Sequence, residues 1–581
     1  MPPLPALDAT TWAPDVAMLS RLANEFFAAP PGHAEPGPTP PMRPAAGGRD
    51  LSSPLGEPST GALPSSPTEL GTPPVALQPV ESSARFVPAG PAPVPSPSSP
   101  YYFLDEAAAF TPASFPTHAA TDVPALPDEA TLQALLTVLP AELAADDPPT
   151  EHPERYFLRL PTERTGRPDP HPPFDVNAVR RDFPILSEQV NGHQLVWLDN
   201  AATTQKPRTV IDRLTHFYEH ENSNVHRAAH ELAARATDAY EGARAKVGRF
   251  LGASSAEEIV FVRGATEGIN LIAQSWGRHN LREGDEIVIS HLEHHANIVP
   301  WHQLVSETGA VLRVIPVDSD GQILLDEYQR LLGDRTKLVS VAHVSNALGT
   351  VTPISEVIDL GHRAGACVLV DGAQSVSHMP VDVRSLDADF FVLSGHKIFG
   401  PTGIGAVYGK ASVLQSMPPW QGGGSMIRDV TLERSLYQDP PMRFEAGTGN
   451  IADAVGLGAA LDYLERLGMA NIERYEHELL AYATHAMLEV PGLCIIGTAP
   501  HKASVLSFVL EGSTPEEVSQ ALNQEGIAVR AGHHCAQPIL RRFGLEATVR
   551  ASLALYNTTD EVDRMVGVLR RLALDTGRAR R

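Results

Sequence analysis

The chain has 581 residues, including 52 prolines, and its 45 basic against 69 acidic side chains give a formal net charge of −24. This acidity argues against a nucleic-acid binder, because such proteins gain affinity largely from cationic contacts to phosphate. No run of about 18 apolar residues predicts a membrane-spanning helix, the first residues lack the pattern of a secretory signal, and three cysteines cannot form a disulfide framework. We therefore expect a cytoplasmic protein without nucleic-acid or membrane partners.

Residues 1–173 differ in composition from the rest of the chain. They contain 37 of the 52 prolines, and their 20 acidic residues and 8 arginines give a net charge of −12. Each proline removes a backbone donor and fixes φ, and so polar a segment buries too little apolar area to offset the entropy of ordering. We predict a disordered, proline-rich arm.

Short apolar segments interrupt this arm. Two have a helical pattern, residues 16–29 and 130–143, and two are aromatic and extended in character, residues 101–104 and 156–160. One interpretation is nascent structure without a function. The other is a set of docking motifs that become ordered on a partner, since apolar anchors on a flexible tether suit coupled folding and binding and gain from multivalency. We favour docking.

From residue 174 onward, short β-branched runs alternate with helical patterns. The predicted strands are residues 258–262, 286–290, 311–317, 337–344, 367–371 and 390–394. The predicted helices between them include residues 296–307 and 354–364. This alternation is typical of βαβ units in a mostly parallel, doubly wound α/β sheet. We assign it to a large domain, residues 174–449.

The last part of the chain, residues 450–581, has a different pattern. It begins with helical patterns at residues 453–467 and 472–488 and continues with strand patterns at residues 505–510 and 528–532. Helices followed by strands are typical of an α+β arrangement. We predict a smaller α+β domain here.

Polar side chains follow two of the predicted strands. Asp371 ends one of them, with Gln374 three residues later, and His396 and Lys397 lie in the glycine-bounded turn after another. Open α/β sheets bind ligands at the carboxyl ends of their strands. A lysine and an aspartate there suit pyridoxal phosphate, which needs a lysine for a Schiff base and an acidic partner for its pyridine nitrogen. We predict a pyridoxal phosphate site.

Two further patterns suit this cofactor. The segment VRGATEGIN predicts a strand, a turn through Gly264 and Thr266, and a helix whose first N–H groups can hold a phosphate. His294 and His295 follow another strand, and their spacing offers no third and fourth metal ligand. We therefore expect no metal, and we assign an imidazole to stacking on the cofactor ring.

A cysteine and an arginine near the C-terminus complete the candidate chemistry. Cys535 lies in RAGHHCAQP among polar and cationic neighbours that favour a thiolate, whereas Cys367 lies in an apolar run. Arg550 offers a planar fork for a substrate carboxylate. We therefore predict Cys535 as a nucleophile and Arg550 as the substrate clamp.

Ten collinear segments carry a match that runs from about residue 176 to about residue 572. They read LDNAATTQKP, VFVRGATEGIN, EHHANIVPW, HVSNALGT, VDGAQSV, SGHKIFGPTGIG, GGGSMI, RFEAGTGN, RAGHHCAQP and RASLALYNT. In this order they resemble the SufS-type, or group II, cysteine desulfurases, which are class V aminotransferase-like enzymes that use pyridoxal 5'-phosphate. The resemblance implies a homodimer with a fold-type I large domain and a smaller C-terminal domain. Gly449 stands where many members have proline, which bears only on local loop rigidity.

The resemblance implies a role for each residue of the site. Catalytic roles fall to Cys535, Lys397 and His294. Cofactor contacts fall to Lys397, Asp371, Gln374, His294, Thr266, Ser394, His396 and, contributed by the second subunit, Thr448. Substrate contacts fall to Asn346, Arg550 and Arg530. In this scheme Lys397 forms the Schiff base and later moves protons, Asp371 pairs with the ring nitrogen, and Cys535 attacks the substrate sulfur.

The activity that the resemblance implies is L-cysteine desulfuration, which releases L-alanine and leaves a persulfide on Cys535 for sulfur transfer and iron–sulfur cluster assembly. Because the loop of residues 530–538 is short, the resemblance also implies an acceptor protein of the SufE or SufU type. The arm is similar in composition to the extensions of desulfurases packaged in family 2 encapsulin shells. Residues 1–173 are therefore expected to place the enzyme inside such a nanocompartment.

Three alternatives stay open. Selenocysteine lyase activity would use the same residues, since selenium leaves more readily than sulfur. A class V aminotransferase-like enzyme without sulfur chemistry would not need Cys535, and a scaffold protein with a lapsed site would not need Lys397 or Asp371. Kinetic comparison of cysteine with selenocysteine distinguishes the first alternative from a desulfurase.

Overall fold

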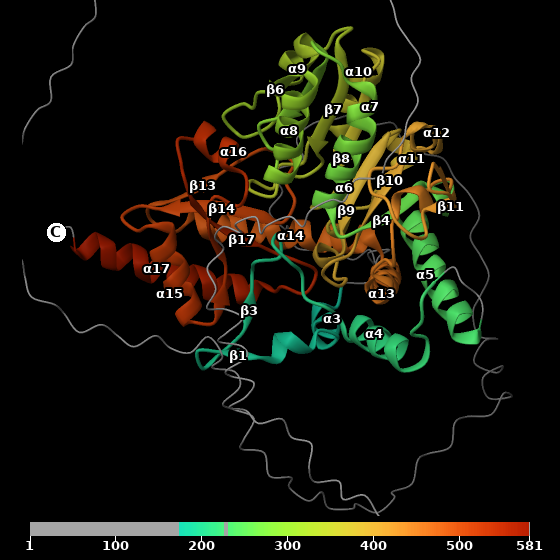
Figure 1. The fold of residues 1–581 in the computed structure, drawn as a ribbon. Helices are drawn as coiled ribbons and strands as arrows, with labels where there is room; N and C mark the ends of the chain where they lie inside the picture. Colours follow the sequence, from blue (N-terminus) through green and yellow to red (C-terminus); the bar gives the residue numbers. More distant parts are fainter. Residues whose placement is uncertain (1–173, 226–229, 580–581) are drawn as a thin grey trace, which may run out of the picture. The chain divides into compact units, whose positions relative to one another are not determined.

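The computed structural model describes residues 174–225 and 230–579, and all of them fall in one compact unit of the chain (Figure 1). The predicted arm and its four apolar segments lie outside the described residues. In the described part, no helix is both long and apolar enough to cross a bilayer.

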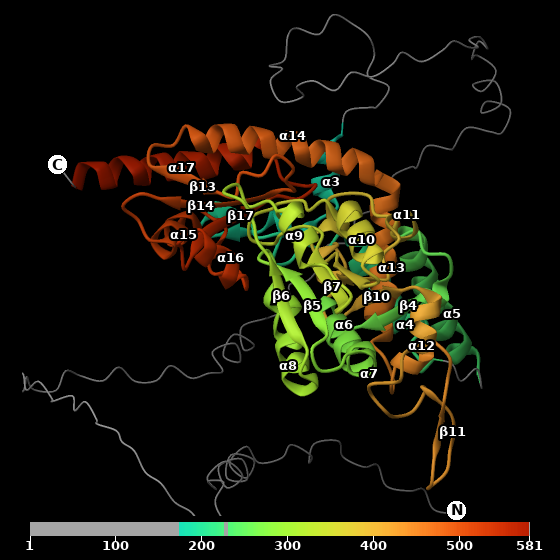
Figure 2. The same ribbon diagram turned by 90° about the horizontal axis from the view of Figure 1, so that it is seen from above.

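A seven-stranded sheet forms the centre of the fold (Figures 1 and 2). Its strands are, in spatial order, β4 (Ile259–Val262), β10 (Gly405–Gly409), β9 (Phe390–Ser394), β8 (Cys367–Asp371), β7 (Thr336–Ala342), β5 (Glu286–Ser290) and β6 (Val311–Ile315). The five strands from β9 to β6 are parallel, and β10 is antiparallel to both of its neighbours. The predicted α/β class and mostly parallel sheet are confirmed.

Within this sheet, the strand that the sequence patterns did not predict is β10. Only ten residues, 395–404, separate it from β9. A parallel neighbour needs a crossover connection of a dozen or more residues, so this short connection returns the chain in the antiparallel direction. The glycines at both ends of β10 also hide it from a search for β-branched runs. The six predicted strands agree with β4 to β9 to within two residues at each end.

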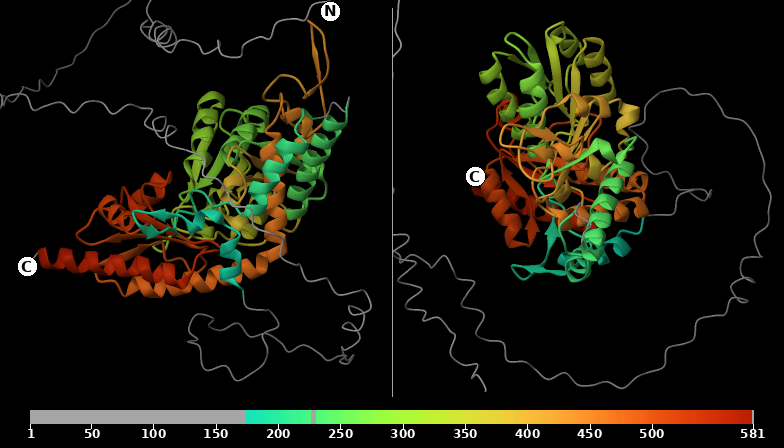
Figure 3. Two further views of the ribbon diagram at one scale, coloured as in Figure 1. Left: turned by 90° about the horizontal axis from the view of Figure 1, so that it is seen from below. Right: turned by 45° about the vertical axis from the view of Figure 1, so that its right-hand side comes forward.

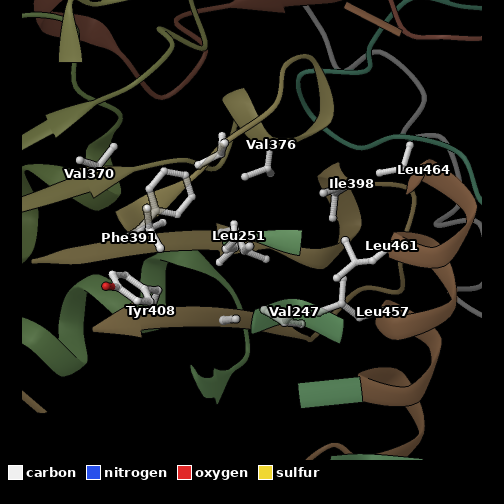
Figure 4. Close-up of a cluster of buried hydrophobic side chains, with 14 of the residues drawn as sticks. Val247, Leu251, Val370, Val376, Phe391, Ile398, Tyr408, Leu457, Leu461 and Leu464 are labelled. Carbon is white, nitrogen blue, oxygen red and sulfur yellow. The ribbon is translucent and has the colours of Figure 1, made fainter. Parts of the chain in front are cut away.

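Helices cover both faces of this sheet. On one face lie α6 (Ala265–Ile272) and α8 (Val299–Thr308), and on the other lie α5 (Glu231–Phe250), α10 (Ile354–Arg363) and α13 (Ile451–Leu467). Figure 4 shows part of the core between the sheet and α5, α10 and α13, where Leu251 and Leu461 lie on the same side of the sheet as Phe391. The predicted helix at residues 296–307 begins late, because a 3₁₀ turn, His295–Asn297, occupies its first residues.

A four-stranded antiparallel sheet forms a second layer with its own core. Its strands are, in spatial order, β13 (Leu493–Ile496), β14 (Val505–Leu510), β17 (Thr548–Ser552) and β16 (Arg530–Gly532). The helices α14 (Met469–Leu488), α15 (Pro515–Gln524) and α17 (Thr559–Ala579) pack on it. In Figure 3, α14 and α17 run along the same side of this layer.

The beginning of the described chain joins this second layer. β3 (Val196–Trp197) pairs in parallel with β15 (Ile527–Ala528), and Asp199 forms a β-bridge with Ser552 at the end of β17. α13, in contrast, does not join the second layer but packs on α5, a helix that covers the seven-stranded sheet. The domain limits at residues 174–449 and 450–581 stay a prediction.

A hairpin of β11 (Ile427–Val430) and β12 (Ser435–Tyr437) extends away from the helices around it (Figure 2). Its side chains include four exposed apolar ones, Val430, Leu432, Leu436 and Tyr437. So many apolar side chains in one short exposed element are typical of a protein–protein contact.

Candidate active site

A pocket of about 200 Å³ lies at the carboxyl ends of β7, β8 and β9. Eleven of the twelve residues predicted for the site line it: Cys535, Lys397, His294, Asp371, Gln374, Thr266, Ser394, His396, Asn346, Arg550 and Arg530. This edge of a parallel sheet is where ligands bind in open α/β folds. The geometry therefore gathers side chains that lie far apart in the sequence into one cavity.

Lys397 and Asp371 extend from neighbouring strands of the sheet. Lys397 ends the 3₁₀ turn that follows β9, and Asp371 is the last residue of β8. Burial lowers the pKa of Lys397 to about 8, although the charge of Asp371 opposes the shift. Burial raises the pKa of Asp371, although an N–H from Ala373 at 3.0 Å stabilises its charged form. At neutral pH such a lysine offers far more free amine than an exposed one, which suits nucleophilic and proton-transfer chemistry.

His294 presents an uncharged ring to the pocket. Burial, and to a smaller extent the positive charge of Lys397, lower its pKa to about 3. Its Nδ1 accepts an N–H from Ala296 at 3.0 Å, so the neutral ring carries its hydrogen on Nε2. A neutral, oriented imidazole can stack on a flat ligand and donate one hydrogen bond.

The first turn of α6 borders the pocket with hydrogen-bond donors. The N–H of Ala265 donates to Ser394 Oγ at 2.9 Å, and the Thr266 hydroxyl lies one residue further on. Gly264 has a φ of 157°, and a Cβ there would approach Ser394 Oγ to 3.2 Å. His396 lines the same pocket, and burial lowers its pKa to about 4. Free N–H groups of a first helical turn beside hydroxyls suit an anion such as a phosphate.

Two amide side chains are oriented by backbone carbonyl groups. Gln374 Nε2 donates to the carbonyl of Ala201 at 2.7 Å, and Asn346 Nδ2 donates to the carbonyl of His534 at 2.7 Å. Asn346 Oδ1 is buried and has no hydrogen-bond partner among the described residues. Since a buried acceptor without a partner is unfavourable, this oxygen is available to a donor of a bound ligand.

Arg550 lines the pocket and is almost completely buried. Its Nη1 donates to the carbonyl of Asn346 at 3.0 Å, and its Nη2 donates to Asp199 Oδ1 at 3.0 Å. Its Nε is buried and has no hydrogen-bond partner in the described part of the chain. Burial lowers the pKa of Arg550, and the charge of Asp199 opposes this. The guanidinium is therefore held in place with donor capacity left for a ligand.

Cys535 lies in a loop with an uncommon backbone conformation. His534 and Cys535 have φ values of 54° and 55°, a region that costs non-glycine residues free energy and is concentrated at functional sites. The N–H of Cys535 donates to His533 Nδ1 at 3.0 Å, and its carbonyl accepts the N–H of His295 at 2.8 Å. Both backbone groups of the cysteine are thus fixed while its thiol lines the pocket.

Thr448 is the one predicted site residue that does not line this pocket. It is exposed and lines two other cavities together with Gly449 and Asn450. Asp199 is a site residue that the sequence analysis missed. The signal for it was present, because Asp199 follows a short apolar run in VWLD, as Asp371 does in VLVD.

The donor set of the pocket fits pyridoxal 5'-phosphate. It combines a lysine of lowered pKa, a buried acid on the neighbouring strand, a neutral imidazole and a helix N-terminus beside a serine hydroxyl. These are the groups that this cofactor needs at its aldehyde, ring nitrogen, ring face and phosphate. Among the described residues, no group of three or more His, Cys, Asp or Glu side chains is placed to hold a metal ion.

Comparison with known proteins assigns most of the described chain to one family. The family model for class-V aminotransferases matches residues 196–565. The chain is 68% identical over 399 residues to a cysteine desulfurase of Synechococcus elongatus, an alignment that covers 69% of this chain and 64% of that protein. It thus spans less than two thirds of this relative's length.

A shorter relative and a solved structure match along almost their whole length. A cysteine desulfurase of Dickeya dadantii is 52% identical over 400 residues, which is 69% of this chain and 97% of that protein. The crystal structure of the Escherichia coli cysteine desulfurase CsdA superposes with a TM-score of 0.65 at 39% identity, and the match covers 69% of this chain and 99% of that one.

Proposed function

We propose that this chain, which belongs to the class-V aminotransferase family, is a pyridoxal phosphate-dependent L-cysteine desulfurase. It converts L-cysteine into L-alanine and retains the sulfur as a persulfide on Cys535. One observation carries this proposal: Lys397 and Cys535 line the same small pocket, where an amine and a thiol can reach one substrate. The desulfurases among its relatives support it.

When bound, the cofactor supplies an electron sink for the substrate. The residues of the pocket bind and orient it. Asp371 pairs with the ring nitrogen, since a cationic partner relieves the unfavourable burial of its carboxylate. The neutral ring of His294 would pack on the cofactor, and Thr266, Ser394 and His396 would hold its phosphate. Gln374, oriented by the carbonyl of Ala201, would contact the phenolic oxygen.

Lys397 would hold the cofactor through its amine, and the same amine would move protons. Its lowered pKa, about 8, keeps a useful fraction of the amine neutral near pH 7, so it can take a proton from the substrate and return one. Arg550 binds the substrate carboxylate through the donors that its protein partners leave free, and Asn346 Oδ1 accepts from the substrate.

Cys535 takes the sulfur from the substrate. Its sulfur forms a bond to the substrate sulfur while the bond between that sulfur and the substrate Cβ breaks. The electron pair of the broken bond stays with the carbon skeleton, and Cβ takes a proton. One L-cysteine and one thiol therefore give one L-alanine and one persulfide.

The assay that tests this function follows alanine. The purified chain, loaded with pyridoxal phosphate and given L-cysteine and a thiol reductant, should release L-alanine and sulfide in equal amounts. The same protein freed of cofactor should release neither. Absence of alanine from the loaded protein would contradict the proposal, and turnover of L-selenocysteine without turnover of L-cysteine would identify a selenocysteine lyase.

We also infer that two copies of the chain form the working enzyme. Thr448 is exposed and lies outside the pocket, so the contact with the cofactor phosphate that the resemblance implies would come from a second subunit. The exposed apolar hairpin of β11 and β12 supplies the kind of surface that a subunit contact buries. A homodimer thus accounts for both the surface position of Thr448 and the exposed apolar side chains of the hairpin.

The loop around Cys535 is fixed by backbone hydrogen bonds, which supports a group II, SufS-type enzyme that works with an acceptor protein. Because the N–H and the carbonyl of Cys535 are both bonded within the fold, the loop cannot carry the persulfide far. An acceptor of the SufE or SufU type must therefore bring its own thiol to the pocket. The sulfur it receives serves iron–sulfur cluster assembly.

We propose that residues 1–173 hold the enzyme inside an encapsulin shell. The arm contains none of the residues predicted for the site, and its apolar segments on a proline-rich tether suit docking. Deleting residues 1–173 should leave alanine release unchanged and abolish co-purification with the shell protein when both are co-expressed. A matched variant, with serine replacing the apolar residues of 16–29 and 130–143, should lose loading while keeping the arm's length and charge. Loading of the deleted form would contradict this role.

A further inference from the structure

Two arginines of the pocket lie directly opposite each other on neighbouring strands. Arg530 of β16 and Arg550 of β17 are register partners in the antiparallel sheet, and both line the pocket. Like charges at directly opposed positions destabilise a sheet. Arg550 is 1% exposed and cannot turn to solvent, whereas Arg530 is 44% exposed. This arrangement therefore needs a counter-charge.

Asp199 supplies that counter-charge to both side chains. Its Oδ1 accepts from Arg550 Nη2 at 3.0 Å, and its Oδ2 lies 3.3 Å from Arg530 Nε. One carboxylate thus bridges two guanidinium groups, and it leaves Arg550 Nε without a partner among the residues described. The net charge of the three side chains is one positive unit.

The fold fixes Asp199 independently of the arginines. Its backbone forms a β-bridge with Ser552 at the end of β17, and its carbonyl accepts the N–H of Ala202 at 3.1 Å. Its side chain is 13% exposed and does not line the pocket. Asp199 therefore does not contact a substrate in the pocket, and it acts on the substrate only through the two arginines.

We propose that Asp199 is a positioning residue: it holds Arg550 and Arg530 so that they form a binding site for a single substrate carboxylate. The inference rests on the proposed desulfurase function. Asp199 occupies one side of each guanidinium, so that the remaining donors of Arg550 converge on one anion. It also neutralises one of the two positive charges. The carboxylate-binding site therefore matches the one carboxylate of L-cysteine and disfavours a substrate with two carboxylates.

The test compares Asp199→Asn with the parent holoenzyme. The variant removes the charge but keeps the size of the side chain. The KM for L-cysteine should rise roughly 10- to 100-fold, as expected for a lost charged hydrogen bond, while kcat changes by less than about threefold, because the reacting groups are untouched. Asp326→Asn, at an exposed site in α9 (Leu325–Leu331), is the matched control and should leave both constants unchanged.

A ligand without the carboxylate separates positioning from general damage to the fold. Cysteamine has the amine and thiol of cysteine but no carboxylate, so its inhibition constant should change by less than about threefold in Asp199→Asn. Equal weakening of L-cysteine and cysteamine would overturn the proposal, because it would show a collapsed pocket. An unchanged KM for L-cysteine would overturn it as well.

The effect of the Asp199 charge on ligand selectivity can be measured separately. Titration calorimetry with L-alanine and L-aspartate on the parent and on Asp199→Asn gives the ratio of their affinities, independently of turnover. The ratio should shift toward L-aspartate in the variant, since two positive charges then face the ligand. An unchanged ratio would contradict the selectivity role. If the parent releases no alanine from L-cysteine, the desulfurase function fails, and this outcome differs from a parent and a variant that behave alike.

Discussion

Replacing Lys397 with alanine should abolish alanine release from L-cysteine, with a loss of roughly a thousandfold or more, as is usual when a central catalytic group is removed. The side chain lies in the pocket, at the end of the turn that follows β9, and its pKa of about 8 leaves a fraction of the amine neutral near pH 7. Without this amine, the cofactor has no covalent partner and the substrate has no base. The purified variant should also lack the visible absorbance of the lysine-bound cofactor.

Lys337→Ala is the matched control for this change. Lys337 lies near the start of β7, at the edge of the sheet opposite the pocket, and its Nζ donates to the carbonyl of Asp334 at 2.7 Å. This variant should keep full activity and full absorbance. A Lys397→Ala protein that still binds cofactor covalently and releases alanine would place the essential amine elsewhere.

Replacing Cys535 with serine should separate cofactor binding from sulfur transfer. The variant retains the pocket's lysine and acid, so its visible absorbance should equal that of the parent. Its alanine release should fall by roughly a thousandfold or more, because an alcohol at this position is a far weaker nucleophile toward sulfur than a thiolate. The two readouts together distinguish loss of the nucleophile from loss of the site.

The other cysteines provide the control for this substitution. Cys494 is an exposed free thiol on β13, and Cys367 is a free thiol at the start of β8 whose pKa is raised by burial. Neither lines the pocket. Serine at either position should leave alanine release unchanged. Loss of activity in Cys494→Ser together with full activity in Cys535→Ser would show that Cys535 is not the nucleophile.

The parts of the fold that follow from local patterns were predictable. The strands β4 to β9 contain short β-branched or aromatic runs, and Asp371 and Lys397 each follow such a run, so both the sheet and the strand-end chemistry can be read from the sequence. β10 escaped this reading, because its glycines and its short connection give no such signal. The helix α8 starts later than predicted, because a 3₁₀ turn occupies the first residues of the predicted helix.

The contacts between distant segments were not predictable from local patterns. Asp199 touches Arg550 across 351 positions of sequence, and the opposition of Arg530 and Arg550 depends on the register of β16 and β17. No periodicity in one segment carries that information. The positive φ of Cys535 is likewise set by the contacts of its loop with His295 and not by the residue type.

The central claim is that the substrate sulfur moves to Cys535. The most direct measurement is peptide mass spectrometry after one turnover of L-cysteine by the holoenzyme, without acceptor or reductant. The account predicts that the peptide with Cys535 gains the mass of one sulfur atom, that reductant removes it, and that Cys367 and Cys494 stay unmodified. Alanine release with the added sulfur on another cysteine, or on none, would contradict the account.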